Sequence, residues 1–275
     1  MDVKTEEITY KTRSDLISGH IAYPAAEGKY PAIVLIHEIF GIDDHIKKVA
    51  DRIAAEGYVV LAPHLFSSKA LSGVLTPENI GAAMKFMMSI PMDKQRDPEF
   101  RAAALAKLDE KSKAAVDGVN EMLFQNRPTK LFVRYLSSGV DYLNSRDNVN
   151  GKIGSAGFCF GGGMSINLAC TGKTDASIIF YGENPTPIGK LKGVKGAVMG
   201  LYGGEDHRIN ANIDKLVKGL VKYQKPFTVK VFPGAHHAFF NDTRPHYNKE
   251  AAEDSWRMMT KFFRDNLAGK PVASV

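Results

Sequence analysis

The stretch Gly157-Phe158-Cys159-Phe160-Gly161-Gly162-Gly163 places a cysteine in a glycine-rich turn, between an apolar run and a segment with helical periodicity. Residues 152–157 are typical of a strand and residues 161–169 of a helix. Glycines two positions either side of Cys159 are expected where a Cβ would collide with the neighbouring strand and helix. The pattern G-x-C-x-G predicts a sharp strand-turn-helix that presents a nucleophile, although a small buried core cysteine would also fit it.

The chain on both sides of this turn alternates between short apolar runs and helical segments. Further strands are predicted at 7–11, 18–23, 31–36, 58–62, 176–181, 195–202 and 227–232, and further helices at 45–56, 209–223 and 247–266. The first two strands form a predicted hairpin. Continuous apolar runs such as 31–36 are typical of strands buried on both faces. The alternation predicts an α/β class with a mostly parallel, doubly wound sheet flanked by helices.

Residues 64–130 interrupt this alternation. The segment has helical character with breaks at prolines, which are Pro77, Pro91, Pro98 and Pro128. We interpret residues 64–130 as a helical insertion, and as a candidate lid, within a single α/β domain that spans residues 1–275.

Composition and charge exclude several classes of protein. The 275 residues are 44% hydrophobic and 24% charged, an ordinary composition for a globular protein with its own core. The net charge of +6 comes from lysines scattered among acidic residues, so no nucleic-acid partner is expected. The longest apolar runs are about strand length, and no membrane span or membrane partner is expected.

The two cysteines, Cys159 and Cys170, suggest neither a disulfide framework nor a zinc site. The N-terminus has acidic residues where a secretion signal needs basic and apolar ones, so a cytoplasmic location is expected. The run Gly161-Gly162-Gly163 lacks the spacing of a dinucleotide-binding loop. Neither a cofactor nor a metal is expected, and the oligomeric state is not readable.

An acid and a histidine follow the cysteine in the order that hydrolases of the α/β class require. Asp206 follows the predicted strand 195–202, and His237 follows the last strand. Loops after parallel strands meet at one edge of the sheet, where the three side chains can converge. Glu205 competes with Asp206 for the role of acid, and His236 competes with His237 for the role of base. Asp206 could also simply cap the following helix.

The combined motifs resemble the dienelactone hydrolases, also called carboxymethylenebutenolidases. They are Gly157-Phe158-Cys159-Phe160-Gly161, Gly203-Gly204-Glu205-Asp206, Pro233-Gly234-Ala235-His236-His237-Ala238-Phe239 and His37-Glu38-Ile39-Phe40-Gly41. The resemblance covers nearly the whole chain outside residues 64–130. It implies an α/β-hydrolase fold and a catalytic triad of Cys159, Asp206 and His237, with Asp206 preferred over Glu205 and His237 over His236.

The resemblance also implies roles for the loop after residues 31–36. Glu38 would lie beside the thiol and govern its ionisation, and the backbone N–H groups of Ile39 and Phe160 would form the oxyanion hole. The expected reaction is attack of Cys159 on an ester or lactone carbonyl, followed by hydrolysis of a thioester intermediate. A polar loop without a catalytic role is the alternative for Glu38.

The expected substrate is a small ester or lactone whose identity the sequence does not specify. Dienelactone hydrolases bind a substrate carboxylate through an arginine upstream of the elbow, but the arginines of this region, Arg96, Arg101, Arg127 and Arg134, do not align with the family pattern. Arg244 is another candidate, against the alternative of an ordinary surface arginine. Two other functions stay open: a general carboxylesterase that does not act on dienelactones, and a non-catalytic protein in which Cys159 is a redox-sensitive thiol.

Overall fold

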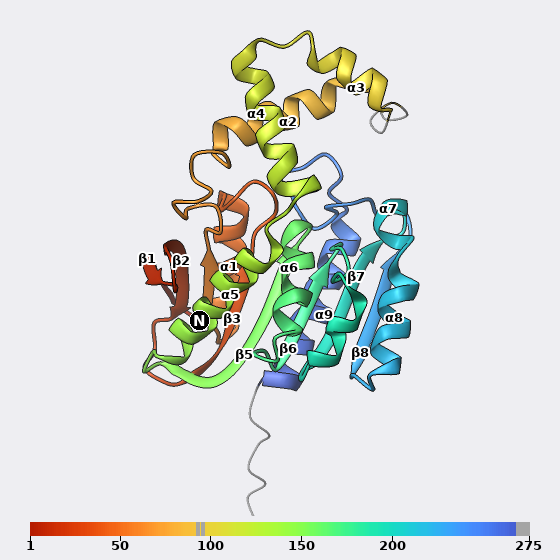
Figure 1. The fold of residues 1–275 in the computed structure, drawn as a ribbon. Coiled ribbons are helices and arrows are strands. Elements are labelled where there is room, and N and C mark those ends of the chain that lie inside the picture. Colours follow the sequence, from red (N-terminus) through yellow and green to blue (C-terminus); the bar gives the residue numbers. More distant parts are fainter. Residues whose placement is uncertain (92–93, 95–96, 268–275) are drawn as a thin grey trace, which may run out of the picture.

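The computed structural model describes residues 1–91, 94 and 97–267, which build an eight-stranded sheet with helices on both faces (Figure 1). In spatial order the strands are β1 (Val3–Lys11), β2 (Leu16–Pro24), β4 (Val59–Pro63), β3 (Tyr30–Ile36), β5 (Val149–Phe158), β6 (Ala176–Phe180), β7 (Ala197–Gly203) and β8 (Phe227–Phe232). The pairs β1–β2 and β2–β4 are antiparallel, and the remaining neighbouring pairs are parallel. The predicted hairpin and mostly parallel sheet are confirmed.

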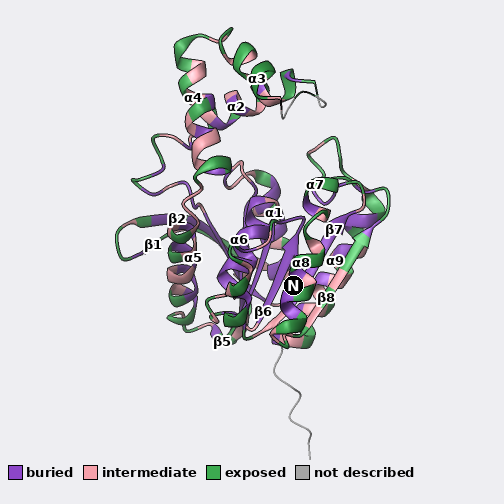
Figure 2. Ribbon diagram, turned by 45° about the vertical axis from the view of Figure 1, so that its right-hand side comes forward, coloured by how far each residue is buried: buried purple, intermediate pink, exposed green. Residues whose placement is uncertain are grey.

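The central strands are continuous apolar runs because both faces of the sheet are covered. Along β3, Ala32, Val34 and Ile36 pack into one core and the alternate residues Ile33 and Leu35 into another. Helices α5 (Thr129–Asn144), α6 (Phe160–Ala169) and α8 (Ile213–Lys222) cover the first face, and α1 (Asp44–Ala55) and α9 (Lys249–Leu267) cover the second. Figure 2 shows the strands as a mainly buried layer between these helices.

The helical insertion extends away from the sheet (top of Figure 1). It contains α2 (Pro77–Ser89), α3 (Pro98–Leu105), α4 (Glu110–Asn120) and the π-helical turn η2 (Glu121–Gln125). Pro77 and Pro98 occupy the first turn of α2 and α3, after the capping residues Thr76 and Asp97. These two prolines therefore begin helices rather than only breaking them, because a first-turn residue needs no N–H partner.

The structure corrects the prediction of one helix over residues 209–223. Two helices occupy this region, α7 (His207–Asn210) and α8, with Ala211 and Asn212 between them. The first begins earlier than predicted because the Asp206 side chain caps it. Helix α5 and the 3₁₀ helix η3 (Ile188–Gly193) were not among the predicted elements. Among the described residues, no helix has the length and apolar character needed to cross a membrane.

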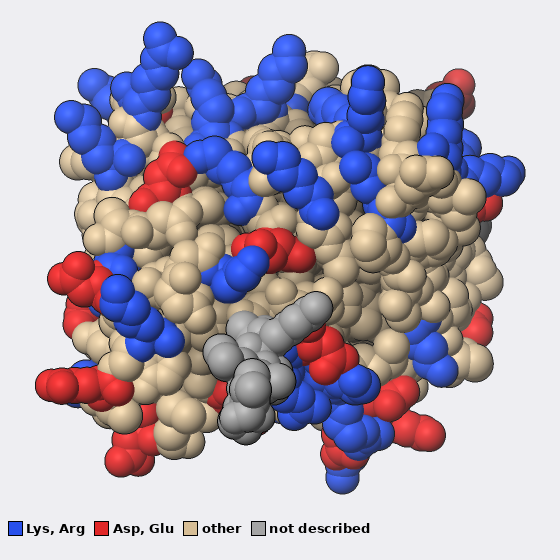
Figure 3. All heavy atoms as spheres, turned by 90° about the horizontal axis from the view of Figure 1, so that it is seen from below, with Lys and Arg blue, Asp and Glu red and all other residues tan. Residues whose placement is uncertain are grey.

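The end of the molecule opposite the insertion carries an uneven distribution of charge (Figure 3). Lys and Arg side chains gather along one edge of this face, with fewer Asp and Glu among them. The net charge of the chain is +6, and the sequence contains no continuous basic block. Folding therefore brings together lysines and arginines that are scattered along the chain.

Candidate active site

Cys159 occupies a strained turn between β5 and α6. Its φ of 54° lies in the left-handed region that non-glycine residues rarely adopt. A Cβ on Gly157 would lie 2.0 Å from the carbonyl oxygen of Gly161, and a Cβ on Gly161 would lie 2.2 Å from the carbonyl oxygen of Ile36. Both contacts are impossible, so the turn requires glycine at these two positions. The tight packing of helix against strand is what holds Cys159 at the carboxyl edge of the sheet.

Asp206 and His237 come together at the same edge. The Asp206 Oδ2 lies 2.5 Å from His237 Nδ1, and the Asp206 Oδ1 accepts a hydrogen bond of 3.4 Å from the Ile209 N–H. Asp206 is only 6% exposed. One carboxylate therefore both caps α7 and orients the imidazole, so the two roles weighed for it from the sequence are compatible.

The two sequence competitors lie elsewhere. The Glu205 carboxylate is 3.9 Å from His207, and both side chains face solvent. The exposed His236 ring packs against His246, with ring centroids 5.1 Å apart. Of the four neighbouring candidates, Asp206 and His237 are thus the pair that the fold joins.

The pKa of His237 reflects an interaction with Cys159. Burial alone lowers this pKa, because it penalises the charged imidazolium. The negative charge of Cys159, with hydrogen bonds to Asp206 and Cys159, outweighs burial and raises the pKa of His237 to about 10. The imidazole of His237 therefore holds its proton well above the ordinary histidine range. By contrast, burial raises the pKa of the Cys170 thiol to about 12, so that thiol stays neutral and unreactive.

The loop after β3 carries Glu38 and Ile39 and is held by His37. The His37 Nε2 accepts a hydrogen bond from the Leu65 N–H at 3.2 Å, so its Nδ1–H donates to the Glu38 carbonyl oxygen at 2.5 Å. Burial lowers the pKa of His37 to about 3. A neutral His37 is therefore a fixed part of the loop that carries Ile39, which lines the same pocket as Cys159.

Glu38 is a buried carboxyl group, and Asn241 Nδ2 donates a hydrogen bond of 2.8 Å to its Oε2. Burial raises the pKa of Glu38, while Asn241 and the charges of His45 and His237 oppose that rise. Burial, together with the negative charges of Glu38 and Cys159, raises the pKa of Tyr181 well above its usual range. The Tyr181 hydroxyl therefore keeps its proton at neutral pH.

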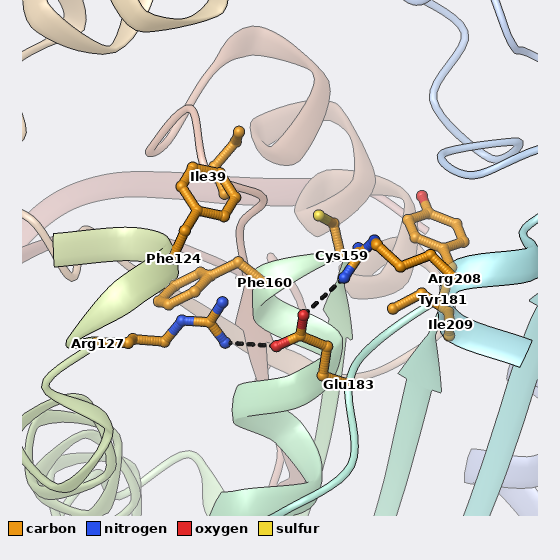
Figure 4. A pocket seen from close by; sticks show the side chains of 9 residues that line it. All are labelled: Ile39, Phe124, Arg127, Cys159, Phe160, Tyr181, Glu183, Arg208 and Ile209. Carbon is orange, nitrogen blue, oxygen red and sulfur yellow. Dashed lines mark hydrogen bonds and ion pairs between the residues drawn. The ribbon is translucent and has the colours of Figure 1, made fainter. Parts of the chain in front are cut away.

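Cys159 lines a pocket with about 280 Å³ of empty space, part of it open to solvent. Figure 4 shows the lining side chains, which are Ile39, Phe124, Arg127, Cys159, Phe160, Tyr181, Glu183, Arg208 and Ile209. The predicted oxyanion residues Ile39 and Phe160 are both present, and Phe160 begins α6, where N–H groups lack helical partners. Sequence reasoning missed Phe124, Tyr181, Glu183, Arg208 and Ile209.

Most of the missed residues share one signal that the sequence contained. Tyr181 and Glu183 follow β6, and Arg208 and Ile209 follow β7, so they lie beyond strand ends that meet at the site edge. Asp206 and His237 were predicted because residues that follow parallel strands gather at the carboxyl edge of the sheet. The same argument applies to the residues after β6. Phe124 had no such signal, because the insertion carries no strand pattern.

Among the candidate arginines, the structure places Arg127 at the pocket. Its Nη1 lies 3.0 Å from Glu183 Oε2, and Arg208 Nη1 lies 2.7 Å from Glu183 Oε1 (Figure 4). Arg244 instead stacks on Phe40, with its guanidinium carbon 3.8 Å from the ring centroid, and does not line the pocket. Arg101 and Arg134 also lie away from the lining, and Arg96 falls outside the described residues.

Within the part of the chain that the structure describes, His, Cys, Asp and Glu side chains form no group of three or more arranged to hold a metal ion.

The sheet order and the strand-turn-helix around Cys159 define the α/β-hydrolase fold. A family model described as the dienelactone hydrolase family matches residues 17–267, and the chain belongs to this family. The family predicted from the motifs is thereby confirmed. As a member, the chain is a hydrolase that acts on ester or lactone bonds.

Individual relatives cover almost the full chain. A protein of Saccharolobus solfataricus named "Putative carboxymethylenebutenolidase" is 39% identical over 94% of this chain and 98% of its own length. A protein of Synechocystis with the same name is 30% identical over 97% of this chain and 99% of its own. A solved structure of a "Putative Dienelactone Hydrolase" from Klebsiella pneumoniae has a TM-score of 0.73 at 22% identity, covering 96% of this chain and 99% of that one, and shares the fold.

Proposed function

We propose that this hydrolase cleaves esters or lactones through Cys159 as nucleophile, with His237 as its proton partner and Asp206 orienting the imidazole. The observation that supports this proposal most strongly is the connected series of side chains from Cys159 through His237 to Asp206, at the carboxyl ends of β5, β8 and β7. A thiolate held beside an imidazolium is the reactive form of a catalytic cysteine.

The chemistry would proceed in two halves. In the first, the Cys159 sulfur attacks the carbonyl carbon, and the N–H groups of Ile39 and Phe160 stabilise the negative charge on its oxygen. The tetrahedral intermediate expels the alkoxide, which takes the proton from His237, and a thioester remains on Cys159. In the second half, neutral His237 accepts a proton from water as the water attacks the thioester, and the acid and the thiolate are released.

Glu38 and Tyr181 support this proposal as groups that adjust the thiolate. Tyr181 packs its ring against His237, with centroids 5.1 Å apart, and burial keeps its hydroxyl group protonated. A buried carboxyl with a raised pKa can exist as the neutral acid and so relieve repulsion of the thiolate. We assign Glu38 as the thiol-modulating residue predicted from the family resemblance.

The pocket supports a substrate with an anionic group. Two guanidinium groups, those of Arg127 and Arg208, share the single carboxylate of Glu183, which leaves one positive charge in excess beside Cys159. A carboxylate-bearing lactone of the dienelactone type fits this charge. A general carboxylesterase acting on neutral esters is the second candidate, because four of the nine lining residues, Ile39, Phe124, Phe160 and Ile209, are apolar.

Hydrolysis of p-nitrophenyl acetate by Cys159→Ala, with Cys170→Ala as the matched control, tests the proposal. We expect Cys159→Ala to lose about 10⁴-fold or more in kcat, and Cys170→Ala to keep wild-type activity. Acid quenching of the wild type during turnover should trap one acetyl group on the Cys159 peptide, located by mass spectrometry. Wild-type activity of Cys159→Ala would refute the mechanism and leave the non-catalytic thiol as the better account of this residue.

A further inference from the structure

Among the described residues of the helical insertion, only Phe124 and Arg127, near its end, line the pocket. Seven of the nine lining residues come from loops or helix starts that follow β3, β5, β6 and β7, and the other two, Phe124 and Arg127, come from the end of the insertion. Helices α2, α3 and α4 extend away from the sheet (Figure 1). The part of residues 64–130 that adjoins Cys159 is therefore the segment around η2.

A π-helical turn presents Phe124. Helix α4 continues into η2, where the Asn126 N–H bonds to the Glu121 carbonyl oxygen at 2.8 Å, five residues back. Such a turn accommodates an extra residue and rotates the side chains that follow, and it is often found at functional sites. Here Leu123 is fully buried in the core, while its neighbour Phe124 is 46% exposed although it is a large aromatic side chain.

Arg127 fixes this turn to the body of the protein. Its Nε donates to the Leu123 carbonyl oxygen at 2.8 Å, and its Nη1 donates to Glu183 at 3.0 Å. The first bond restrains η2, and the second ties it to the loop after β6. The backbone that carries Phe124 is thus restrained beside the pocket.

The Phe124 ring forms part of one wall of the pocket. Phe124, Ile39 and Phe160 lie on one side of it, and Tyr181, Arg208 and Ile209 lie on the other (Figure 4). Its empty space is about 280 Å³ with the open mouth included, which leaves little room for a long substrate chain. A substrate group longer than a few methylenes, extending from the reacting carbonyl toward η2, would meet the Phe124 ring.

We propose that Phe124 sets the upper limit on the size of the acyl group that the enzyme accepts, so that short acyl groups are its substrates. This inference rests on the proposed function, since it concerns the group that becomes attached to Cys159. The π-helical turn sets the position of the backbone that carries the ring, and Arg127 restrains that turn.

The test is the acyl-chain profile of kcat/KM on p-nitrophenyl esters, from acetate to decanoate. The wild type should prefer acetate and butyrate. Phe124→Ala should raise the octanoate-to-acetate ratio of kcat/KM by about tenfold or more, because each buried methylene is worth roughly 0.8 kcal/mol, or about fourfold. Phe124→Leu should give an intermediate ratio and Phe124→Trp a lower one.

The matched control is Phe100→Ala, which removes another exposed aromatic ring from the same insertion, on α3, and should leave the ratio unchanged. The proposal is overturned if the wild type shows no preference for short chains, or if folded Phe124→Ala and Phe124→Leu keep the wild-type ratio. It is also overturned if Arg208→Ala alone widens the profile, since the opposite wall would then set the limit. These outcomes can be told apart from failure of the proposed mechanism. If the mechanism fails, Cys159→Ala hydrolyses every ester at the wild-type rate.

Discussion

The Nδ1 atom of His237 lies 2.5 Å from Oδ2 of Asp206, although the two residues are 31 positions apart and follow different strands. Glu205, one residue before Asp206, instead points toward His207. The contact fixes which imidazole nitrogen faces the acid, so that the other nitrogen is available to Cys159.

Asp206→Asn should therefore reduce kcat on p-nitrophenyl acetate by about 10⁴-fold, because an amide can hold the wrong tautomer of the imidazole and cannot offset its positive charge. Stopped-flow measurement of the rate of p-nitrophenol release checks this. Glu205→Gln is the control and should stay within about twofold of the wild type. If the two variants lose activity equally, Asp206 is not the orienting acid.

The pH dependence of activity should follow His237, whose pKa is raised to about 10. We expect kcat/KM to fall as pH rises through about 10, because the leaving group then loses its proton donor. A fall centred near the ordinary histidine value of 6.5 would contradict the ion pair.

The same raised pKa predicts how stability changes with pH. A group that binds its proton more tightly when folded stabilises the protein fully below its unfolded pKa, and this stabilisation is lost as pH rises toward the folded pKa. The free energy of unfolding of the wild type, relative to His237→Gln, should decline from about pH 6.5 and level off above about pH 10. Urea unfolding at several pH values measures it, and a difference that grows with pH would have the wrong sign.

Two glycine substitutions should change stability in opposite directions. Gly157→Ala should cost about 4 kcal/mol or more, since its Cβ would lie 2.0 Å from a backbone oxygen. Gly81→Ala, inside α2 with no atom within 4 Å of the added Cβ, should stabilise by about 0.5–1 kcal/mol. Thermal melting followed by circular dichroism measures both, and similar melting temperatures for the two variants would contradict the packing argument at the elbow.

The charged residues of the pocket, Arg127, Glu183 and Arg208, should determine the preference for anionic substrates. Glu183→Gln leaves both arginines uncompensated and should raise kcat/KM for a p-nitrophenyl ester with a terminal carboxylate, relative to p-nitrophenyl butyrate, by about fivefold. Arg208→Gln should lower the same ratio by a similar factor.

The control for this experiment is Arg134→Gln, which removes an exposed arginine that does not line the pocket. If Glu183→Gln and Arg208→Gln keep the wild-type ratio while their melting temperatures fall, the ion pairs serve stability alone, and the general carboxylesterase becomes the better proposal.

The strand positions and the order of the candidate site residues could be predicted from the sequence. Continuous apolar runs such as 31–36 specify strands covered on both faces, and parallel strands bring the residues after them to one edge. The glycines around Cys159 made the strand-turn-helix predictable, because a Cβ at Gly157 or Gly161 is sterically impossible there. These features depend on local patterns that a single sequence contains.

The choice between neighbouring residues and the composition of the pocket depended on tertiary structure. Arg127, Glu183 and Arg208 are far apart in the chain, and only packing of the insertion against the strand ends makes them one cluster. The position of Phe124 depends on one backbone hydrogen bond that spans five residues instead of four. The hydrophobic periodicity of the sequence does not reveal this π-helical turn. The sequence by itself thus determined the fold class and the candidate reacting groups, whereas contacts between distant segments decided the shape and charge of the space around Cys159.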